Sequence, residues 1–123
     1  LRELIAGSDL IIDAMLGYGI NGELYGEVRR LIRLVTYSTT SVLAVDLPSG
    51  LDPDQGYQCE PVMRANLTAS LALPKVGLTF ADSKEYIGDV YLLDIGVPDA
   101  WFTQEKFARP PYGPHGYVKL TDQ

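Results

Sequence analysis

The sequence predicts an α/β domain with a mainly parallel sheet, and three observations support this prediction. Two apolar runs of strand length, residues 10–12 and 42–45, flank a segment whose apolar residues recur at helical spacing. Both runs are apolar without alternation, as expected of strands that are covered on both faces. A strand–helix–strand order of this kind is typical of α/β domains with parallel sheets.

The first half of the chain begins with a helix end and contains one amphipathic helix. Residues 1–6 are interpreted as the end of a helix that Gly7 stops. Glycines at three positions then punctuate the loop that follows the first strand. After this loop an apolar stripe at helical spacing predicts a helix packed on the sheet, and three arginines off the stripe are expected to form its solvated face. The stripe consists of Leu24, Val28, Leu31, Ile32 and Val35, and the arginines are Arg29, Arg30 and Arg33.

The second half supplies two further strands. Residues 67–73 predict a strand that Pro74 halts, because proline cannot donate to the hydrogen-bond ladder. Residues 76–87 are interpreted as irregular, with a short strand at 78–80. Residues 90–93 predict the last strand.

The chain is expected to form a single domain with a tail. Residues 1–98 form the predicted core. Residues 99–123 are expected to wrap the surface as an extended C-terminal tail, because the prolines at 110, 111 and 114 remove backbone donors and restrict φ.

Composition excludes several classes of function. The 123-residue chain has a formal net charge of −6, which argues against a nucleic-acid partner because such a protein needs a basic face. Cys59 is the only cysteine, so neither an internal disulfide nor a thiolate metal cluster can form, and a cytoplasmic location is expected. No apolar run approaches the ~20 residues of a membrane-spanning helix. The chain begins with Leu1, which suggests a piece of a longer protein.

Two aspartates follow predicted strands. Asp13 and Asp46 each come directly after an apolar run. In open α/β sheets, ligands bind beyond the carboxyl ends of the strands. Capping a turn or a helix is the commoner use of a single aspartate. Two aspartates in the same setting, each with glycine or serine close behind, favour a binding site at this edge.

Other candidate residues carry weaker signals. The glycine-rich stretch 17–22 could bring backbone N–H groups to a phosphate, although it is neither a GxGxxG motif nor a P-loop, and a tight connection is the alternative. Lys75 follows the proline that ends a strand and is a candidate phosphate or carboxamide contact, with a solvated surface lysine as the commoner alternative. His115 lies in the tail and is not expected to act as a base.

Four stretches of the chain carry a family resemblance. They are DAMLGYGINGE, AVDLPSGLDPDQG, LPKVGL and IGDVYLLDIGVP. The same stretches occur in the same order in the YjeF N-terminal domain family of NAD(P)HX epimerases, which this chain resembles from residue 10 to about 98. The tail RPPYGPHGYVKL also resembles the end of single-function family members. The resemblance implies a Rossmann-like, three-layer α/β/α fold.

The resemblance implies an activity and a site. The activity is an isomerase that interconverts the R and S epimers of hydrated NADH and NADPH, so that a separate NAD(P)HX dehydratase can repair both. The family's site uses a potassium ion, and Asp13 and Ser49 match its potassium-linked aspartate and serine. Carboxylate and hydroxyl oxygens suit such a hard cation. Asp46 matches a substrate-contacting aspartate. The substrate-contacting loop matches Gly17, Tyr18, Gly19, Ile20, Asn21, Gly22 and Glu23.

Asp46 is the predicted catalytic residue. The strand before it and the restricted φ of Pro48 are expected to hold it at the rim of the sheet. Epimerisation at the hydrated ring carbon needs proton transfer and a flattened, charge-shifted intermediate. A carboxylate can serve as the base or can stabilise an iminium-like cation.

One part of the family pattern is not found before residue 10. It is an Asn/Gly/Asp-rich loop of the NNGGDG type, which supplies phosphate contacts and another potassium ligand. The chain therefore resembles the later part of the domain, as a fragment or truncated copy, and is expected to be inactive alone. An unpaired sheet edge would favour association, such as a homodimer. The alternatives are a non-catalytic binding or dimerisation scaffold and a generic nucleotide-binding domain. The presence of Asp13, Asp46 and Ser49 favours the epimerase.

Overall fold

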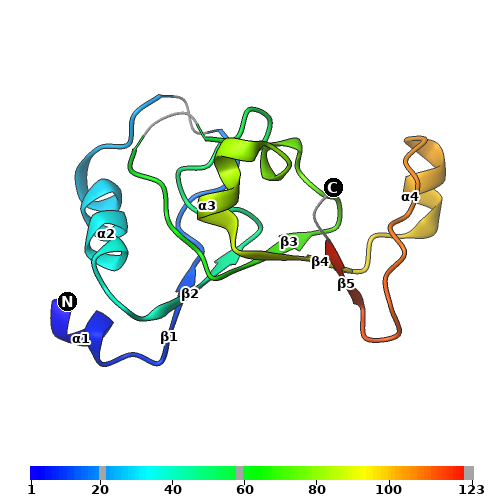
Figure 1. Cartoon of the computed structure of the whole chain (residues 1–123). Helices are drawn as coiled ribbons and strands as arrows, with labels where there is room; N and C mark the ends of the chain where they lie inside the picture. The colour runs from blue at the N-terminus through cyan, green and yellow to red at the C-terminus, as the bar shows by residue number, and fades with distance from the viewer. Residues whose placement is uncertain (20–21, 58–59, 121–123) are drawn as a thin grey trace.

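The computed structural model describes residues 1–19, 22–57 and 60–120 and is built on one five-stranded sheet (Figure 1). The strands lie in the order β1-β2-β3-β4-β5; neighbours from β1 to β4 are parallel, and β5 is antiparallel to β4. The predicted α/β fold with a mainly parallel sheet is therefore confirmed. The strands are β1 (Leu10–Asp13), β2 (Ser41–Val45), β3 (Leu67–Leu71), β4 (Asp89–Leu93) and β5 (Tyr117–Leu120).

The helices are short apart from one. In Figure 1, α2 and α3 lie on the same side of the sheet, and α4 lies at the opposite end of the molecule from α1. No helix in the described part of the chain has the length and apolar character to cross a membrane. The α-helices are α1 (Arg2–Ala6), α2 (Gly26–Thr36), α3 (Lys84–Ile87) and α4 (Asp99–Gln104), and two 3-10 helices are η1 (Val76–Leu78) and η2 (Ala81–Ser83).

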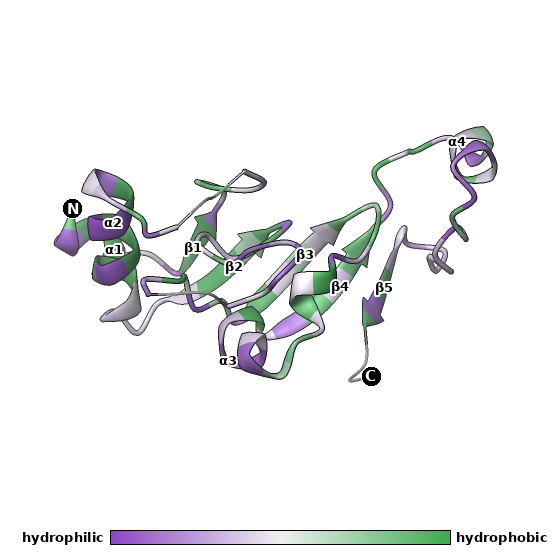
Figure 2. Ribbon diagram, turned by 90° about the horizontal axis from the view of Figure 1, so that it is seen from above, coloured by the Kyte–Doolittle hydropathy of each residue, from purple (hydrophilic) through white to green (hydrophobic). Residues whose placement is uncertain are grey.

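One face of the sheet carries the buried core. The strand register aligns Ala44 with Thr68 and Thr68 with Val90, so these buried residues share a face. On this face α2 covers one apolar cluster and α3 a second, and Figure 2 shows green hydrophobic residues along β2, while β1 and β5 also carry purple hydrophilic ones. The α2 cluster contains Ile32, Val35, Val42, Ala44, Met63 and Ala65. The α3 cluster contains Leu47, Leu51, Val62, Leu78, Tyr86, Ile87 and Val90.

The other face and the β1 edge are less covered. Leu43 and Val45 of β2 are only partly buried. Leu10 and Ile12 of β1, which is one of the two edge strands, are 50% and 61% exposed. An exposed edge strand of this kind can pair with further strands, as the sequence led us to expect.

The arginines of α2 differ from one another. Arg30 and Arg33 are exposed, as predicted, and Arg30 pairs with Glu27 one turn earlier. Arg29 is partly buried, because its guanidinium folds back to the carbonyl of Leu24.

Two local predictions in the second half are wrong. The strand predicted at 67–73 ends at Leu71, because Ala72 adopts a left-handed φ of 60° and turns the chain. Residues 78–80 form no strand; η1 and η2 fill this region, and Leu78 packs into the α3 cluster. An apolar run of three residues satisfies either a strand or a 3-10 turn, and packing decided between them.

The tail is only partly extended. Residues 110–114 form no helix, as predicted, but the start of the tail forms α4, which Pro98 precedes at the N-cap position and Phe102 anchors in the interior. The end of the tail is strand β5, whose Val118 and Leu120 are partly buried. The predicted fully extended tail is therefore wrong at 99–104, because a buried aromatic side chain stabilises a helix turn there.

Gly88 lies where no other residue fits. It joins α3 to β4 with a φ of 58°, and a Cβ at this position would lie 2.2 Å from the carbonyl oxygen of Asn66. We expect Gly88→Ala to lower the free energy of unfolding by at least ~2 kcal/mol, measured by urea denaturation. Gly96→Ala is the matched control, because its φ is also positive but its Cβ would meet nothing within 4 Å. Equal losses for the two variants would contradict the steric explanation.

A charged clamp holds the tail against β4. The Asp94 carboxylate accepts hydrogen bonds from Gly96 N–H (2.9 Å) and from Arg109 Nη2 (2.8 Å), and these contacts lower the pKa of Asp94. A carboxylate with a lowered pKa stabilises the folded state above its ordinary pKa and loses that contribution as the pH falls through the lowered value. We expect the fluorescence of Trp101 on α4 to change as the pH falls below about 4. Arg109→Met should shift that transition to higher pH, and an unchanged profile would contradict the clamp.

Candidate functional site

Asp13 and Ser49 form a buried pair at the carboxyl edge of the sheet. Asp13 is the last residue of β1 and is 1% exposed; Ser49 lies in the loop after β2 and is fully buried. Ser49 N–H donates to Asp13 Oδ2 (2.7 Å), and the Ser49 hydroxyl donates to Oδ1 (2.6 Å). Leu16 N–H in turn donates to Ser49 Oγ (3.0 Å). The pair therefore ties the loop after β1 to the loop after β2.

The Asp13 carboxylate is buried without a counter-charge among the described residues. No ion pair in the described ranges reaches it. Buried charges in proteins are normally paired or bound to a metal ion. A carboxylate has about four lone-pair positions, of which Ser49 uses two, and the Ser49 hydroxyl oxygen keeps a lone pair beside its bond from Leu16. The donor set of Asp13 and Ser49 therefore fits a monovalent cation that prefers oxygen.

Asp46 is held in an unusual conformation. Its φ is 70°, a left-handed value that aspartate tolerates better than most residues. Its N–H donates to the carbonyl of Ala69 (2.8 Å), and its Oδ1 accepts from Leu71 N–H (3.0 Å) and from the ammonium of Lys75. Its side chain is 21% exposed. Bonds to β3 thus fix a partly accessible carboxylate beyond the end of β2.

Lys75 is not the solvated surface lysine that the sequence favoured. Its side chain is only 9% exposed, and its ammonium donates to Asp46 Oδ1 and to the carbonyl of Leu71 (2.6 Å). The available signal in the sequence was its position in the turn that follows the carboxyl end of β3. Its predicted alternative role, a contact to phosphate or carboxamide, stays a prediction.

The two aspartates lie at the same edge of the sheet. β1 and β2 are parallel neighbours, and Asp13 aligns with Ala44, two residues before Asp46. Two surface hollows, of about 460 and 320 Å³, lie away from this edge of the sheet, against α1 and α2. The first is lined by Leu1, Arg2, Glu3, Arg30 and Leu34.

Tyr18 of the glycine-rich loop lies within electrostatic range of three carboxylates. Desolvation, followed by the carboxylates of Asp54, Asp46 and Asp52 in that order, raises the pKa of Tyr18, although this residue is 64% exposed. A Cβ at Gly17, Gly19 or Gly22 would meet nothing within 4 Å, so the loop does not need glycine for packing there.

Backbone conformation explains why two of these positions are glycine. Gly19 and Gly22 have φ values of 87° and 79°, which favour glycine. Glu23 pairs with Arg29 at 3.6 Å, so its carboxylate already has a cationic neighbour. The predicted contacts Ile20 and Asn21 lie outside the described residues.

Comparison with protein families gives a match over most of the core. The model of the family described as YjeF-related protein N-terminus matches residues 1–77. The matched part contains Asp13, Asp46, Ser49 and Lys75.

Curated relatives match over most of this chain. The NAD(P)H-hydrate epimerase of Pirellula staleyi is 40% identical over 95 residues, which are 77% of this chain and 42% of that protein. The NAD(P)H-hydrate epimerase of Dehalogenimonas lykanthroporepellens is 33% identical over 116 residues, 93% of this chain and 46% of that protein. The bifunctional NAD(P)H-hydrate repair enzyme Nnr of Archaeoglobus fulgidus is 34% identical over 121 residues, 90% of this chain and 25% of that protein. The chain thus spans less than half the length of these relatives.

A solved structure supports the same fold. This chain superposes on the crystal structure of the yeast protein ynu0 with a TM-score of 0.80 at 19% identity. The match covers 97% of this chain and 50% of the yeast chain. At this identity the likeness concerns the fold. The family match, which covers more than half of the chain, adds the sequence evidence. The chain therefore belongs to the YjeF-related N-terminal family.

Proposed function

We propose that this chain carries part of the site of an NAD(P)H-hydrate epimerase, an isomerase that interconverts the R and S epimers of hydrated NADH and NADPH. The observation that carries the proposal is that two carboxylates, each fixed by its own hydrogen bonds, lie at the same edge of the sheet. Asp13 is bound by Ser49, and Asp46 is bound by Leu71 and Lys75. Relatives named NAD(P)H-hydrate epimerase match 77% and 93% of the chain, which supports the same activity here.

Asp46 is the proposed catalytic residue. Its carboxylate is partly accessible and is held by β3 before any substrate arrives, which lowers the cost of orienting it. Inversion requires the C–O bond of the hydrated ring carbon to break as its oxygen leaves as water, which gives a planar, cationic ring carbon, and water to add again on the opposite face. A proton joins the leaving oxygen and is released again when water adds. Asp46 can accept and return that proton, or it can stabilise the cationic ring.

Asp13 and Ser49 are the proposed potassium ligands. Their oxygens form a buried set that carries one negative charge with no cationic neighbour in the described part of the chain. A potassium ion held there would supply a fixed positive charge next to an anionic dinucleotide. Asp13 would provide the charge that selects a cation, and the Ser49 hydroxyl would provide a neutral oxygen.

The glycine-rich loop is the proposed substrate contact. Its described members are Gly17, Tyr18, Gly19, Gly22 and Glu23, and a Cβ at any of the three glycines would meet nothing within 4 Å, which leaves room for a ligand. A separate NAD(P)HX dehydratase is the proposed partner in repair, because some relatives are named bifunctional repair enzymes. A cytoplasmic location and a homodimer remain parts of the proposal.

The test is exchange between the two epimers of hydrated NADH, followed by NMR with potassium present. The natural full-length protein that contains this sequence should equilibrate the epimers, and the 123-residue chain alone should not, because the phosphate-binding loop of the family is not found in it. No exchange by the full-length protein would contradict the proposal. Retained binding of the hydrate without exchange would instead favour the binding scaffold.

A further inference from the structure

We infer that Lys75 is a positioning residue that fixes the Asp46 carboxylate by one oxygen and leaves the other, Oδ2, as the reacting atom. This inference rests on the proposed function, since it names how the catalytic carboxylate is oriented. Lys75 itself is not required to touch the substrate.

Both donors to Asp46 bind the same oxygen. Leu71 N–H and the Lys75 ammonium both donate to Oδ1. Oδ2 has no hydrogen-bond partner within the part of the chain that the structure describes, and it is not among the fully buried polar atoms that lack one. Oδ2 therefore keeps some contact with solvent, while Oδ1 is occupied by two donors.

Lys75 is itself held in place before substrate binds. Its ammonium also donates to the carbonyl of Leu71, and its side chain is 9% exposed, so it has little rotational freedom. The same residue, Leu71, thus donates its N–H to Asp46 and accepts from Lys75. These three groups form a closed set of hydrogen bonds at the end of β3.

The turn that presents Lys75 is also fixed. It passes through Ala72, whose φ of 60° is a value that alanine rarely adopts. The carbonyl of Ala72 accepts a hydrogen bond from the Tyr112 hydroxyl of the tail. A strained turn that is bonded from the tail keeps the lysine directed at the carboxylate.

The ammonium also defines the charge of the site. The Lys75 ammonium and the Asp46 carboxylate form an ion pair of opposite charges. The pair is close to neutral, so it is better suited to move a proton at a defined atom than to balance a full positive charge. This favours the base role for Asp46 over the role of a lone anion.

The experiment compares Lys75→Met with the wild type in the natural full-length protein, using hydrated NADH and the epimer-exchange assay. Methionine keeps the apolar stem and removes the donors and the charge. We expect kcat to fall by about 10²-fold, because a misplaced reacting atom costs that much, with KM changed less than about threefold. Lys75→Ala should regain activity when propylammonium is added, because the free amine can occupy the vacated position.

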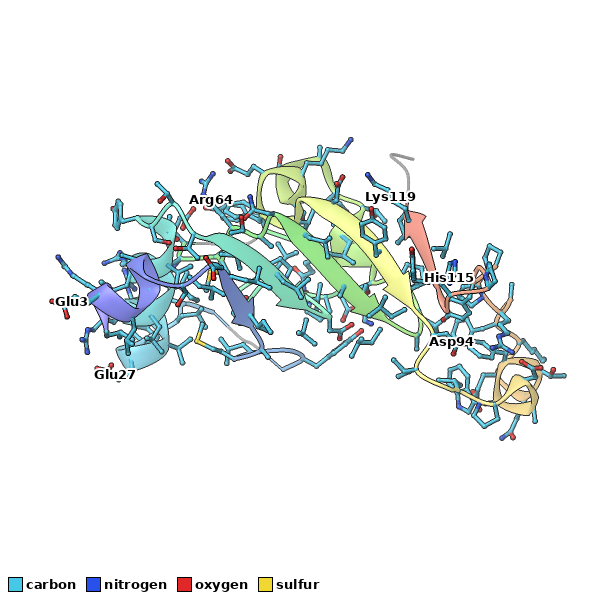
Figure 3. The ribbon with its side chains drawn as sticks, turned by 90° about the horizontal axis from the view of Figure 1, so that it is seen from below. Glu3, Glu27, Arg64, Asp94, His115 and Lys119 are labelled. Carbon is cyan, nitrogen blue, oxygen red and sulfur yellow. The ribbon has the colours of Figure 1, made fainter. Side chains whose placement is uncertain are left out.

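Lys119→Met is the matched control. Lys119 also pairs with an aspartate, Asp89 (2.9 Å), but at the amino end of β4. Figure 3 shows Lys119 and Asp94 at opposite ends of the β4–β5 pair. Removing this second lysine–aspartate pair should leave kcat unchanged.

Each outcome decides between explanations. A wild-type kcat in Lys75→Met overturns the inference and leaves the epimerase proposal standing. A raised KM at unchanged kcat also overturns it and shows that Lys75 binds substrate. If the wild type itself is inactive, the epimerase proposal fails, and crystal structures of the wild type and Lys75→Met still test the geometry. The variant should show the Asp46 carboxylate rotated or in two conformers; an unmoved carboxylate would overturn the inference.

Discussion

Asp46→Asn is expected to lower kcat for epimer exchange by about 10²–10⁴-fold in the natural full-length protein, the usual cost of losing a general acid–base group. Asparagine has nearly the same shape and can still accept from Leu71 N–H and Lys75 through its carbonyl oxygen. It cannot take up the proton, and the position of Oδ2 becomes an amide that donates. The measurement is epimer exchange by NMR at saturating hydrated NADH.

Stability and binding separate this chemical effect from misfolding. The free energy of unfolding of Asp46→Asn should stay close to the wild-type value, because the contacts at Oδ1 survive. Asp82→Asn, at an exposed position of η2, removes the same charge away from the site and should exchange the epimers at the wild-type rate. An Asp46→Asn protein with wild-type kcat would show that the catalytic assignment is wrong.

Asp13→Asn is expected to abolish the response to potassium. The substitution removes the only charge of the proposed ligand pair, so potassium affinity should fall by at least ~10-fold. It also places an amide N–H opposite one of the two Ser49 donors, which should lower the free energy of unfolding by about 1–3 kcal/mol.

Melting temperatures of the wild type and of two variants check this second prediction. In the wild type, the melting temperature should rise as potassium replaces sodium at constant ionic strength, because a ligand that binds only the folded state stabilises it. The same replacement should leave the melting temperature of Asp13→Asn unchanged. Ser49→Ala should show a reduced but measurable potassium response, since one neutral oxygen of several is lost. A normal response in Asp13→Asn would contradict the proposed potassium site.

The sequence predicted the frame of the sheet correctly because its signals are local. Residues 10–12 and 42–45 are short apolar runs, and both lie in parallel strands. The placement of Asp13 and Asp46 at one edge also followed from the sequence, since parallel neighbours end on the same side. The amphipathic stripe through Ile32 and Val35 predicted a helix, and both residues are buried on the face of α2 that packs against the sheet.

The sequence did not predict η1 or α4, because short segments carry little information about their secondary structure. Residues 78–80 fitted a strand pattern, yet Leu78 lies in η1 and packs under α3. The start of the tail held enough helix-forming residues for α4, but only the burial of Phe102 decided that they fold that way.

The composition and motif pattern of the sequence determined the class of fold, the edge on which the acids lie and the family resemblance. The tertiary structure alone decided that the Lys75 side chain is only 9% exposed, that it contacts Asp46, 29 positions earlier in the chain, and that both donors to Asp46 bind one oxygen. Such a contact depends on the register of β2 against β3 and on the left-handed φ values of Asp46 and Ala72. These are properties of the packed backbone, and the identity of any single residue does not determine them.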